Sequence, residues 1–283
     1  MFTLTAERTD GKRLTLTQYG SAYTVTYAGF GPVAANVATS PRGMSNGDKI
    51  NSTRRGKRNA MLYVTIEGNV EQNRIRLYDF FTPEHSVRLY YKNGTRNVYT
   101  EGTVETHECD QFSSPVVAQI SIICPSPFWL GAQEIVKNIS GVVSMFSFPF
   151  SIAASGMEMS SLTGEEYALL RNEGDEPAGF VATVYARENV INPVIYNALT
   201  NEAIGITGTL EKGSTLTIST NIGNKRIRIT DAAGAERNAL NLKRKGTTWP
   251  QLAPGDNYIA YSAQEGADSM MVTLHHNELF VGV

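Results

Sequence analysis

Apolar and polar residues alternate along most of the first 125 positions, which is the pattern of β-strands with one buried face. Leu14 and Leu16 alternate with threonines, as do Tyr23, Val25 and Tyr27. The clearest segments of this kind are RLTLTQY (13–19), YTVTY (23–27), MLYVTIE (61–67) and VVAQISIIC (116–124). We therefore expect this part of the chain to consist mostly of antiparallel strands.

The period changes once, after Gly68, where NVEQNRIRLYDFFTPE (69–84) has a helical spacing. Asn69 is a suitable N-cap with Gln72 three residues later, and Pro83 stops the segment. One face of the predicted helix is apolar and carries Val70, Leu77, Tyr78 and Phe81. The spacing predicts one helix inserted among the strands.

The strand VVAQISIIC is followed at once by two prolines and two large aromatic residues. Pro125 and Pro127 lack amide donors and fix φ, so the strand cannot continue past Cys124. Phe128 and Trp129 can then lock the path by which the chain leaves this region. The stretch is consistent with a rigid junction between two domains, and equally with an ordinary strand end whose aromatics enter the core.

The second half of the chain consists of short alternating segments separated by Gly, Asn and Asp turns, a pattern typical of a β-sandwich. A short helix near LTGEEYALLRN (162–172) is the only other helical candidate. A linker is expected from about Pro125 to Ser151, through SMFSFPFS. The expected strands are GFVATVYA (179–186), NPVIYN (192–197), TLTISTN (215–221), KRIRIT (225–230) and SMMVTLHH (269–276).

Composition fits a strand-rich globular protein made in the cytoplasm. Of the 283 residues, 18% are charged and 41% are hydrophobic, which excludes disordered and fibrous classes. No apolar run approaches the length of about 18 residues that a membrane span needs. The N-terminus carries charge early and lacks the apolar segment of a secretory signal. Two cysteines, Cys109 and Cys124, are too few for a disulfide framework, so we expect reduced thiols facing a core.

Positive charge is concentrated in residues 40–59, SPRGMSNGDKINSTRRGKRN, which contain almost no apolar side chain. The segment has a net charge of +5 in a chain of net charge −2, so the remainder carries −7. We expect a long structureless loop here, either an arm that lies against a more acidic neighbouring subunit or faces nucleic acid, or a solvated flexible loop. Its cations are Arg42, Lys49, Arg54, Arg55, Lys57 and Arg58, against the single Asp48.

Catalytic and metal motifs are weak, and we predict no enzyme activity, metal or cofactor. The sequence GMSNG (43–47) matches the nucleophile elbow formally, but no strand delivers the serine and no helix follows. His275 and His276 are adjacent on an expected strand, so they point to opposite faces. His107 and Cys109 could share a face near Cys124, but tetrahedral zinc requires four ligands.

Near the C-terminus, TTWPQLAPGDNYI (247–259) combines Trp249 and Leu252 with a Pro254-Gly255 turn and Asn257. Pro, Gly and Asn supply turn geometry, and the tryptophan is expected to cover an edge or the core of the sandwich. A lone tryptophan on a sandwich could instead stack on a sugar ring. We interpret Trp249, Leu252 and Asn257 as a structural turn.

In order and spacing, these segments resemble the distal tail proteins of siphophages, of the type found in phages and prophages of Gram-positive hosts. The resemblance covers nearly the whole chain and rests on CPSPFW (124–129), NPVIYNALTNEAIGI (192–206), LTISTN (216–221), WPQLAPGDNYI (249–259) and ELFVGV (278–283). It implies a mainly β fold: a ring-forming, β-barrel-like N-terminal domain with one inserted helix (1–125), a linker (126–150) and a C-terminal galectin-like β-sandwich (151–283).

The resemblance also implies a structural virion protein at the distal end of the tail. Members of this family form a hexameric ring that joins the tail tube protein to a tail-associated lysin or other tail-tip protein, with receptor-binding proteins beyond and a central channel through which the genome DNA passes. By position, residues 40–59 match a loop that wraps the adjacent subunit, and Phe128 and Trp129 match the junction of the ring with the outer domain. The alternative is a carbohydrate-binding module for cell-surface glycans, although the residues after Trp249 lack the galectin sugar-binding pattern.

Overall fold

The computed structural model describes residues 1–139 and 167–283, and these divide into two compact units. Unit 1 comprises residues 1–133 together with 279–283, and unit 2 comprises residues 134–278. This division differs from the expected one, because the chain returns to unit 1 at its end. The pairing of Leu130 with Leu279 and the burial of Phe280 attach these last residues to unit 1.

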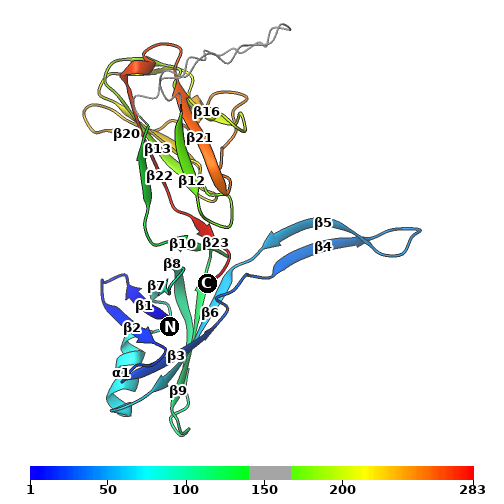
Figure 1. Cartoon of the computed structure of the whole chain (residues 1–283), viewed down its shortest axis with the longest axis vertical. Helices are drawn as coiled ribbons and strands as arrows, with labels where there is room; N and C mark the ends of the chain where they lie inside the picture. Colours follow the sequence, from blue (N-terminus) through cyan, green and yellow to red (C-terminus); the bar gives the residue numbers. More distant parts are fainter. Residues whose placement is uncertain (140–166) are drawn as a thin grey trace. The chain divides into compact units, whose positions relative to one another are not determined.

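Unit 1 is a seven-stranded β-barrel in the order β8-β7-β1-β2-β3-β6-β9, closed by the pairing of β8 with β9 (Figure 1). The strand β8 is long enough to pair with β9 near its end and with β10 near its beginning, and β23 then pairs with β10. The strands are β1 (Thr3–Arg8), β2 (Arg13–Thr17), β3 (Tyr23–Ala28), β6 (Arg58–Ile66), β7 (Ser86–Lys92), β8 (Asn97–Cys109), β9 (Val117–Cys124), β10 (Trp129–Gly131) and β23 (Leu279–Phe280).

The predicted helix is confirmed as α1 (Val70–Phe80). The Asn69 side chain accepts a hydrogen bond from the amide of Gln72, as an N-cap does. Leu77, Phe80 and Phe81 are buried in the core of unit 1. The alternating strand segments are likewise confirmed, because Leu4, Leu16, Val25, Leu62 and Leu89 all point into the barrel and are fully buried.

The basic segment 40–59 is not a structureless loop, which corrects the expectation from sequence. It lies largely within a hairpin of two strands, β4 (Ala35–Pro41) and β5 (Asp48–Arg55), joined by the turn 42–47. The two strands pair only with each other among the described strands (Figure 1). Threonine, valine and isoleucine in alternation with polar residues supply the β-propensity that the charge concealed.

Unit 2 contains two main sheets that share one apolar core, as in a sandwich. The larger sheet has the order β11-β22-β13-β18-β19-β20, and the smaller one has the order β12-β21-β15-β16. Their bounds are β11 (Ile135–Asn138), β12 (Ala168–Asn172), β13 (Phe180–Ala186), β15 (Val194–Asn197), β16 (Ala203–Gly205), β18 (Thr215–Ser219), β19 (Arg226–Thr230), β20 (Glu236–Asn238), β21 (Gly255–Ser262) and β22 (Met270–His276). The remaining elements are β14 (Val190–Ile191), β17 (Thr209–Leu210), η1 (Leu240–Leu242) and η2 (Ala267–Ser269).

Two expectations for the middle of the chain need correction. Residues 168–172 of LTGEEYALLRN form the strand β12 and not a helix, while residues 162–166 lie outside the described part of the chain. The linker expected over 126–150 is only partly described. Trp129 and its neighbours belong to β10 of unit 1, and residues 140–150 lie outside the described part. The mainly β fold class is nevertheless confirmed.

Candidate functional site

The β4–β5 hairpin has two chemically different faces. Directly paired residues share a face, and the register pairs Val37 with Thr53 and Thr39 with Ile50 on one side, and Asn36 with Arg54 and Ser40 with Lys49 on the other. The first side is apolar at its centre, since Val37 and Ile50 are 50% and 63% exposed. The second side is polar and cationic. Sequence reasoning noticed only the charge and missed the apolar face.

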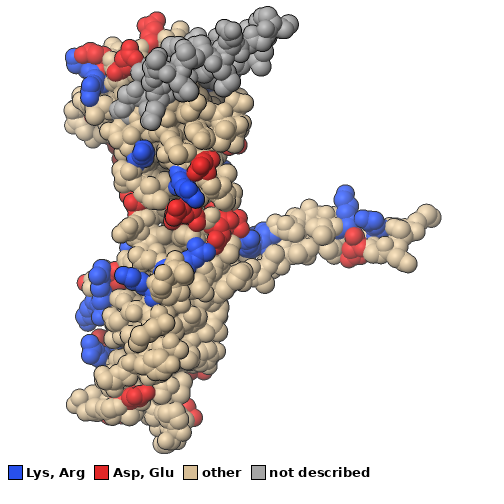
Figure 2. Space-filling view, viewed as in Figure 1, with Lys and Arg blue, Asp and Glu red and all other residues tan. Residues whose placement is uncertain are grey.

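Polar contacts inside the hairpin hold its strands in register. Thr39 Oγ1 donates a hydrogen bond of 2.9 Å to Asp48 Oδ2, and Ser40 Oγ donates one of 3.2 Å to Asn51 Oδ1. Asp48, the single acidic residue of the segment, therefore accepts a hydrogen bond within the hairpin, and it lies on the same face as Thr39. In Figure 2 blue lysine and arginine atoms stand out along the hairpin with one red group among them.

The six predicted cations are separated by the structure. Lys49 and Arg54 share the polar face of the hairpin, and Arg42 lies in its turn. Arg55 is on the opposite face at the base of the hairpin, where its guanidinium lies 5.3 Å from the centroid of the Phe128 ring. Lys57 follows β5 and is exposed. These five fit an interaction arm.

Arg58 does not belong to the arm, which corrects its assignment to an inter-subunit loop. The residue is fully buried at the start of β6. Its Nη1 donates hydrogen bonds of 2.7 Å to the carbonyls of Gly29 and Gly31, and its Nη2 donates to Pro127 at 2.5 Å and Val281 at 3.0 Å. Burial lowers the pKa of the guanidinium. Arg58 thus links the segment after β3, the segment before β10 and the end of the chain through its hydrogen bonds.

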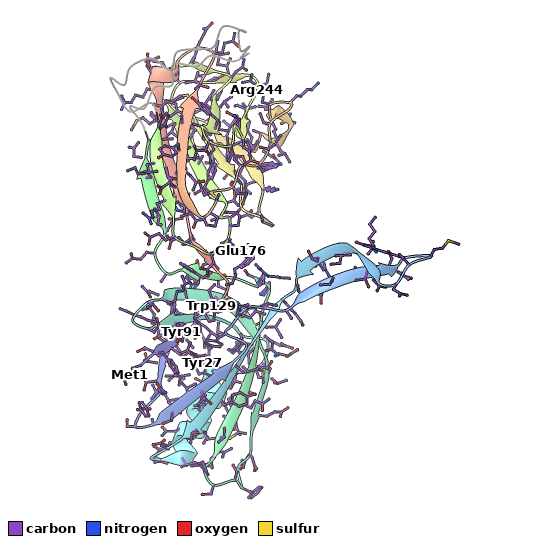
Figure 3. The ribbon with its side chains drawn as sticks, turned by 45° about the vertical axis from the view of Figure 1, so that its right-hand side comes forward. Met1, Tyr27, Tyr91, Trp129, Glu176 and Arg244 are labelled. Carbon is purple, nitrogen blue, oxygen red and sulfur yellow. The ribbon has the colours of Figure 1, made fainter. Side chains whose placement is uncertain are left out.

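The junction aromatics lie within unit 1. Trp129 is fully buried, and its Nε1 donates a hydrogen bond of 3.1 Å to the carbonyl of Phe30. Tyr27, Tyr91 and Trp129 come together in one region of unit 1 in Figure 3, and the Tyr27 and Tyr91 hydroxyls are 3.1 Å apart. Burial, together with this contact, raises the pKa of Tyr27 to about 12. These aromatic side chains pack together in the core of unit 1. Their packing holds in place the segment around Trp129, by which the chain leaves the barrel.

The Trp249 turn is built as a structural feature of unit 2. Leu252 is fully buried and exchanges backbone hydrogen bonds with Ala178. The buried Asn257 side chain donates to the carbonyls of Ala253, at 2.8 Å, and Gly255, at 3.1 Å, and its Oδ1 accepts from the amide of Ala253 at 3.0 Å. These contacts satisfy a tight turn with a single side chain.

Trp249 is half-buried against the core of unit 2. The ammonium groups of Lys225 and Lys243 lie 5.8 and 6.0 Å from the centroid of its ring, within the range of cation–π contacts. Lys243 also donates to the carbonyl of Thr247. The Trp249 ring is thus in contact with the core of unit 2 and with two lysine side chains.

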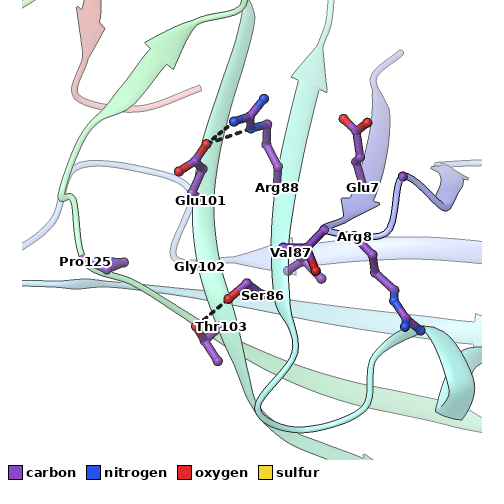
Figure 4. Close-up of a pocket in the computed structure, with 11 residues that line it drawn as sticks. Glu7, Arg8, Ser86, Val87, Arg88, Glu101, Gly102, Thr103 and Pro125 are labelled. Atoms are coloured by element: carbon purple, nitrogen blue, oxygen red, sulfur yellow. Dashed lines mark hydrogen bonds and ion pairs between the residues drawn. The ribbon is translucent and has the colours of Figure 1, made fainter. Parts of the chain in front are cut away.

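A hollow of about 550 Å³ in unit 1 lies against β1, β7 and β8 (Figure 4). Glu7, Arg88 and Glu101 contribute its charged side chains, together with Arg8. Arg88 and Glu101 form an ion pair, which occupies the charges that a polar ligand would use. Among the described residues, no histidine or cysteine lines this hollow, whose hydroxyl groups come from Thr9, Ser86 and Thr103.

The remaining candidates for chemistry are dispersed. Within residues 1–139 and 167–283, no three His, Cys, Asp or Glu side chains gather as metal ligands would. His275 and His276 do point to opposite faces, because His276 is buried while His275 Nδ1 lies 3.4 Å from Glu134 Oε2. Cys124 is buried and Cys109 partly so, and both are free thiols. None of the helices described is long and apolar enough to cross a membrane.

Comparison with known proteins gives a consistent result. Residues 173–280 match the family described as siphovirus-type tail component, C-terminal domain. The crystal structure of SPP1 Dit (gp 19.1), described as a paradigm of the hub adsorption apparatus in phages that infect Gram-positive bacteria, matches with a TM-score of 0.65 and 11% identity over 98% of this chain and 99% of that one.

A second structure, the phage P2 baseplate in its activated conformation with Ca, matches with a TM-score of 0.52 and 10% identity over 98% of each chain. At such identities the structural matches establish a shared fold, which extends over both units. No curated protein matches the sequence. The resemblance to distal tail proteins is thereby confirmed for the family of the C-terminal region and for the fold of the chain.

Proposed function

Because residues 173–280 match the siphovirus-type tail component family, we propose that the chain is a distal tail protein, a structural hub of the virion without catalytic activity. Copies of unit 1 form a hexameric ring at the lower end of the tail tube. The ring connects the tube protein to the tail-associated lysin or tail-tip protein and to a receptor-binding protein. Its channel lets the genome DNA pass without sequence-specific contacts.

The free-standing β4–β5 hairpin is the observation that carries this proposal. An isolated two-stranded hairpin is at best marginally stable in water, so strands of this length with exposed side chains are suited to packing on a partner. A heterologous contact, in which an arm of one copy lies on the body of the next, closes into a ring when the rotation fits.

Charge supports the same contact. Without the buried Arg58, the segment 40–59 still carries five cations and one acid, whereas the rest of the chain is acidic. Opposite net charges favour the approach of the arm of one copy to the body of another. The same cations would also be compatible with proximity to the DNA in the channel.

Size-exclusion chromatography with light scattering on the full-length chain, followed by imaging of the largest species, tests the proposal. We expect rings of six copies. A variant in which residues 36–54 are replaced by a short Gly-Ser turn should be a monomer with an unchanged thermal transition, because the removed side chains pack on no core. A full-length chain that stays monomeric at every concentration, or a hairpin deletion that still forms rings, contradicts the role of the arm.

A further inference from the structure

Positive charge in unit 2 is concentrated in one stretch of the chain, residues 224–245, which we call the basic segment. It contains seven Lys and Arg residues against two acids, a net charge of +5. The rest of unit 2 contains four against fourteen, a net charge of −10. The basic segment comprises β19, β20, η1 and the residues that flank them. A local excess of cations on an otherwise acidic unit directs anions to one part of its surface.

Two lysines of the basic segment meet at the Trp249 ring. Lys225 directly precedes β19 and Lys243 directly follows η1, and their ammonium groups lie 5.8 and 6.0 Å from the centroid of the ring. These distances are close to the limit of about 6 Å for a cation–π contact, so neither ammonium group is pressed onto the ring. Within residues 1–139 and 167–283 neither lysine pairs with a carboxylate, and Lys243 donates to the carbonyl of Thr247. Both charges can therefore bind a ligand.

The backbone around Trp249 is fixed, so the ring is held in one place. Gln251 Nε2 donates hydrogen bonds to the carbonyls of Thr220, at 2.8 Å, and Pro250, at 3.1 Å. Pro250 and Leu252, on either side of Gln251, are buried. Trp249 itself packs against the core of unit 2 but is only half-buried, so part of its indole ring remains exposed. A ligand would thus find the ring already positioned, which reduces the entropic cost of binding.

We propose that Trp249, Lys225 and Lys243 form a binding site for a phosphate-bearing sugar. The apolar face of a sugar ring can stack on the exposed part of the indole. The two ammonium groups bind the phosphate as compact point charges. A neutral sugar or a bare phosphate binds more weakly, because each uses only half of the site. The site lies in unit 2 and does not depend on the self-assembly proposed above.

Tryptophan fluorescence of the full-length protein tests the inference. The chain has two tryptophans and Trp129 is fully buried, so a ligand at the surface changes the emission of Trp249. Glucose 6-phosphate is the probe, and glucose and inorganic phosphate are its two halves. We expect a saturable change with a Kd of about 1 mM, and binding of each half weaker by about tenfold or more. The affinity should fall as salt is added, and the Trp249→Phe variant should give no change.

Two lysine variants provide a matched comparison. Lys225→Gln removes an exposed ammonium group beside the ring and should weaken binding of glucose 6-phosphate by about threefold or more. Lys212→Gln is the control, because Lys212 is an exposed lysine of the same unit that pairs with Glu188, and it should leave the affinity unchanged. Equal thermal unfolding of the two variants confirms that both fold.

Several outcomes would overturn the site. These are the absence of saturable binding by the wild-type chain, equal binding of glucose or of phosphate alone, and an equal loss of affinity in the two lysine variants. Tighter binding of a DNA oligonucleotide than of glucose 6-phosphate at equal phosphate concentration, weakened by Lys225→Gln, would assign the cations to nucleic acid instead. None of these outcomes bears on the proposed ring, because chromatography with light scattering reports self-assembly separately.

Discussion

The guanidinium of Arg58 lies 5.3 Å from the centroid of the Trp129 ring, and both side chains are fully buried. Within residues 1–139 and 167–283, the hydrogen-bond partners of this cation are four backbone carbonyls and no carboxylate. Charge-assisted hydrogen bonds and the face of an indole ring compensate for its burial. The pair, which we call the lock, therefore holds β6, the strand after the hairpin, to two other segments of unit 1. These are the segment at Pro127, where the chain leaves unit 1, and the segment at Val281, where it returns.

Replacing Arg58 by Met should destabilise unit 1 strongly. The carbonyls of Gly29, Gly31, Pro127 and Val281 would lose their donor inside the protein, and we expect a loss of about 3 kcal/mol or more in the free energy of unfolding. Denaturant titration measures this loss. Arg54→Met, on the exposed face of the hairpin, is the matched control and should change stability by less than about 0.5 kcal/mol. Similar stability of the two variants would contradict the lock.

Gly29 should tolerate no side chain. Its φ is +74°, and a Cβ atom would lie 1.9 Å from the carbonyl oxygen of Asn59. We expect Gly29→Ala to cost about 3 kcal/mol or more, or to prevent folding of unit 1. Gly31→Ala is the control, because nothing lies within 4 Å of its Cβ position although its carbonyl also binds Arg58. Thermal unfolding of the two variants would be equal only if the backbone near Gly29 adopts a different path.

Acid should destabilise both units through one histidine in each, the half-buried His107 and the buried His276. Burial lowers the pKa of His107 in unit 1 and of His276 in unit 2 below the ordinary value of 6.5. The unfolded chain then binds more protons than the folded chain, so stability is complete above pH 6.5 and is lost as pH falls toward the folded-state pKa values. The loss amounts to about 1.4 kcal/mol for each unit of pKa depression.

Denaturant titrations from pH 7 to 5 measure this slope. His107→Phe and His276→Phe should each reduce it, whereas His85→Gln, at an exposed histidine, should leave it unchanged. An unaltered slope in the two phenylalanine variants would mean that other groups cause the acid sensitivity.

The polar face of the hairpin should govern the rate of assembly more than its extent. Lys49→Gln with Arg54→Gln removes two exposed cations and leaves the apolar face intact. We expect slower association with a weaker dependence on salt, and an oligomer of unchanged mass. Stopped-flow light scattering at several salt concentrations provides the measurement. Complete loss of the oligomer in this variant would place the cations inside the contact and not beside it.

The local elements of this fold could be predicted from sequence where one periodicity dominates. The N-cap Asn69 and the apolar face with Leu77 identified α1. Alternation identified β2, β3, β6 and β9 of the barrel and β13, β15, β18, β19 and β22 of unit 2. The strand stop at Cys124 followed from the missing amides of two prolines. These features depend on residues close together in the chain, so composition and spacing contain the information.

The features that could not be predicted depend on distant partners. Arg58 looked like one more cation of a basic run, and only the approach of Gly29, Pro127 and Val281 shows that it is buried. The hairpin was concealed because its many charges resemble those of a solvated loop, although ANVAT already alternates. Likewise, β23 is only two residues long, and nothing local indicates that it pairs with β10.

The pairing of β10 with β23 has a consequence for how such chains can change over time. Unit 2 enters and leaves unit 1 at two neighbouring strands, with Leu130 opposite Leu279. The insertion points are thus adjacent, and the barrel contributes every one of its own strands without help from the inserted residues. Unit 2 is therefore an insertion at one place in the chain: it can be exchanged, enlarged or lost by recombination there while the barrel of unit 1 remains closed.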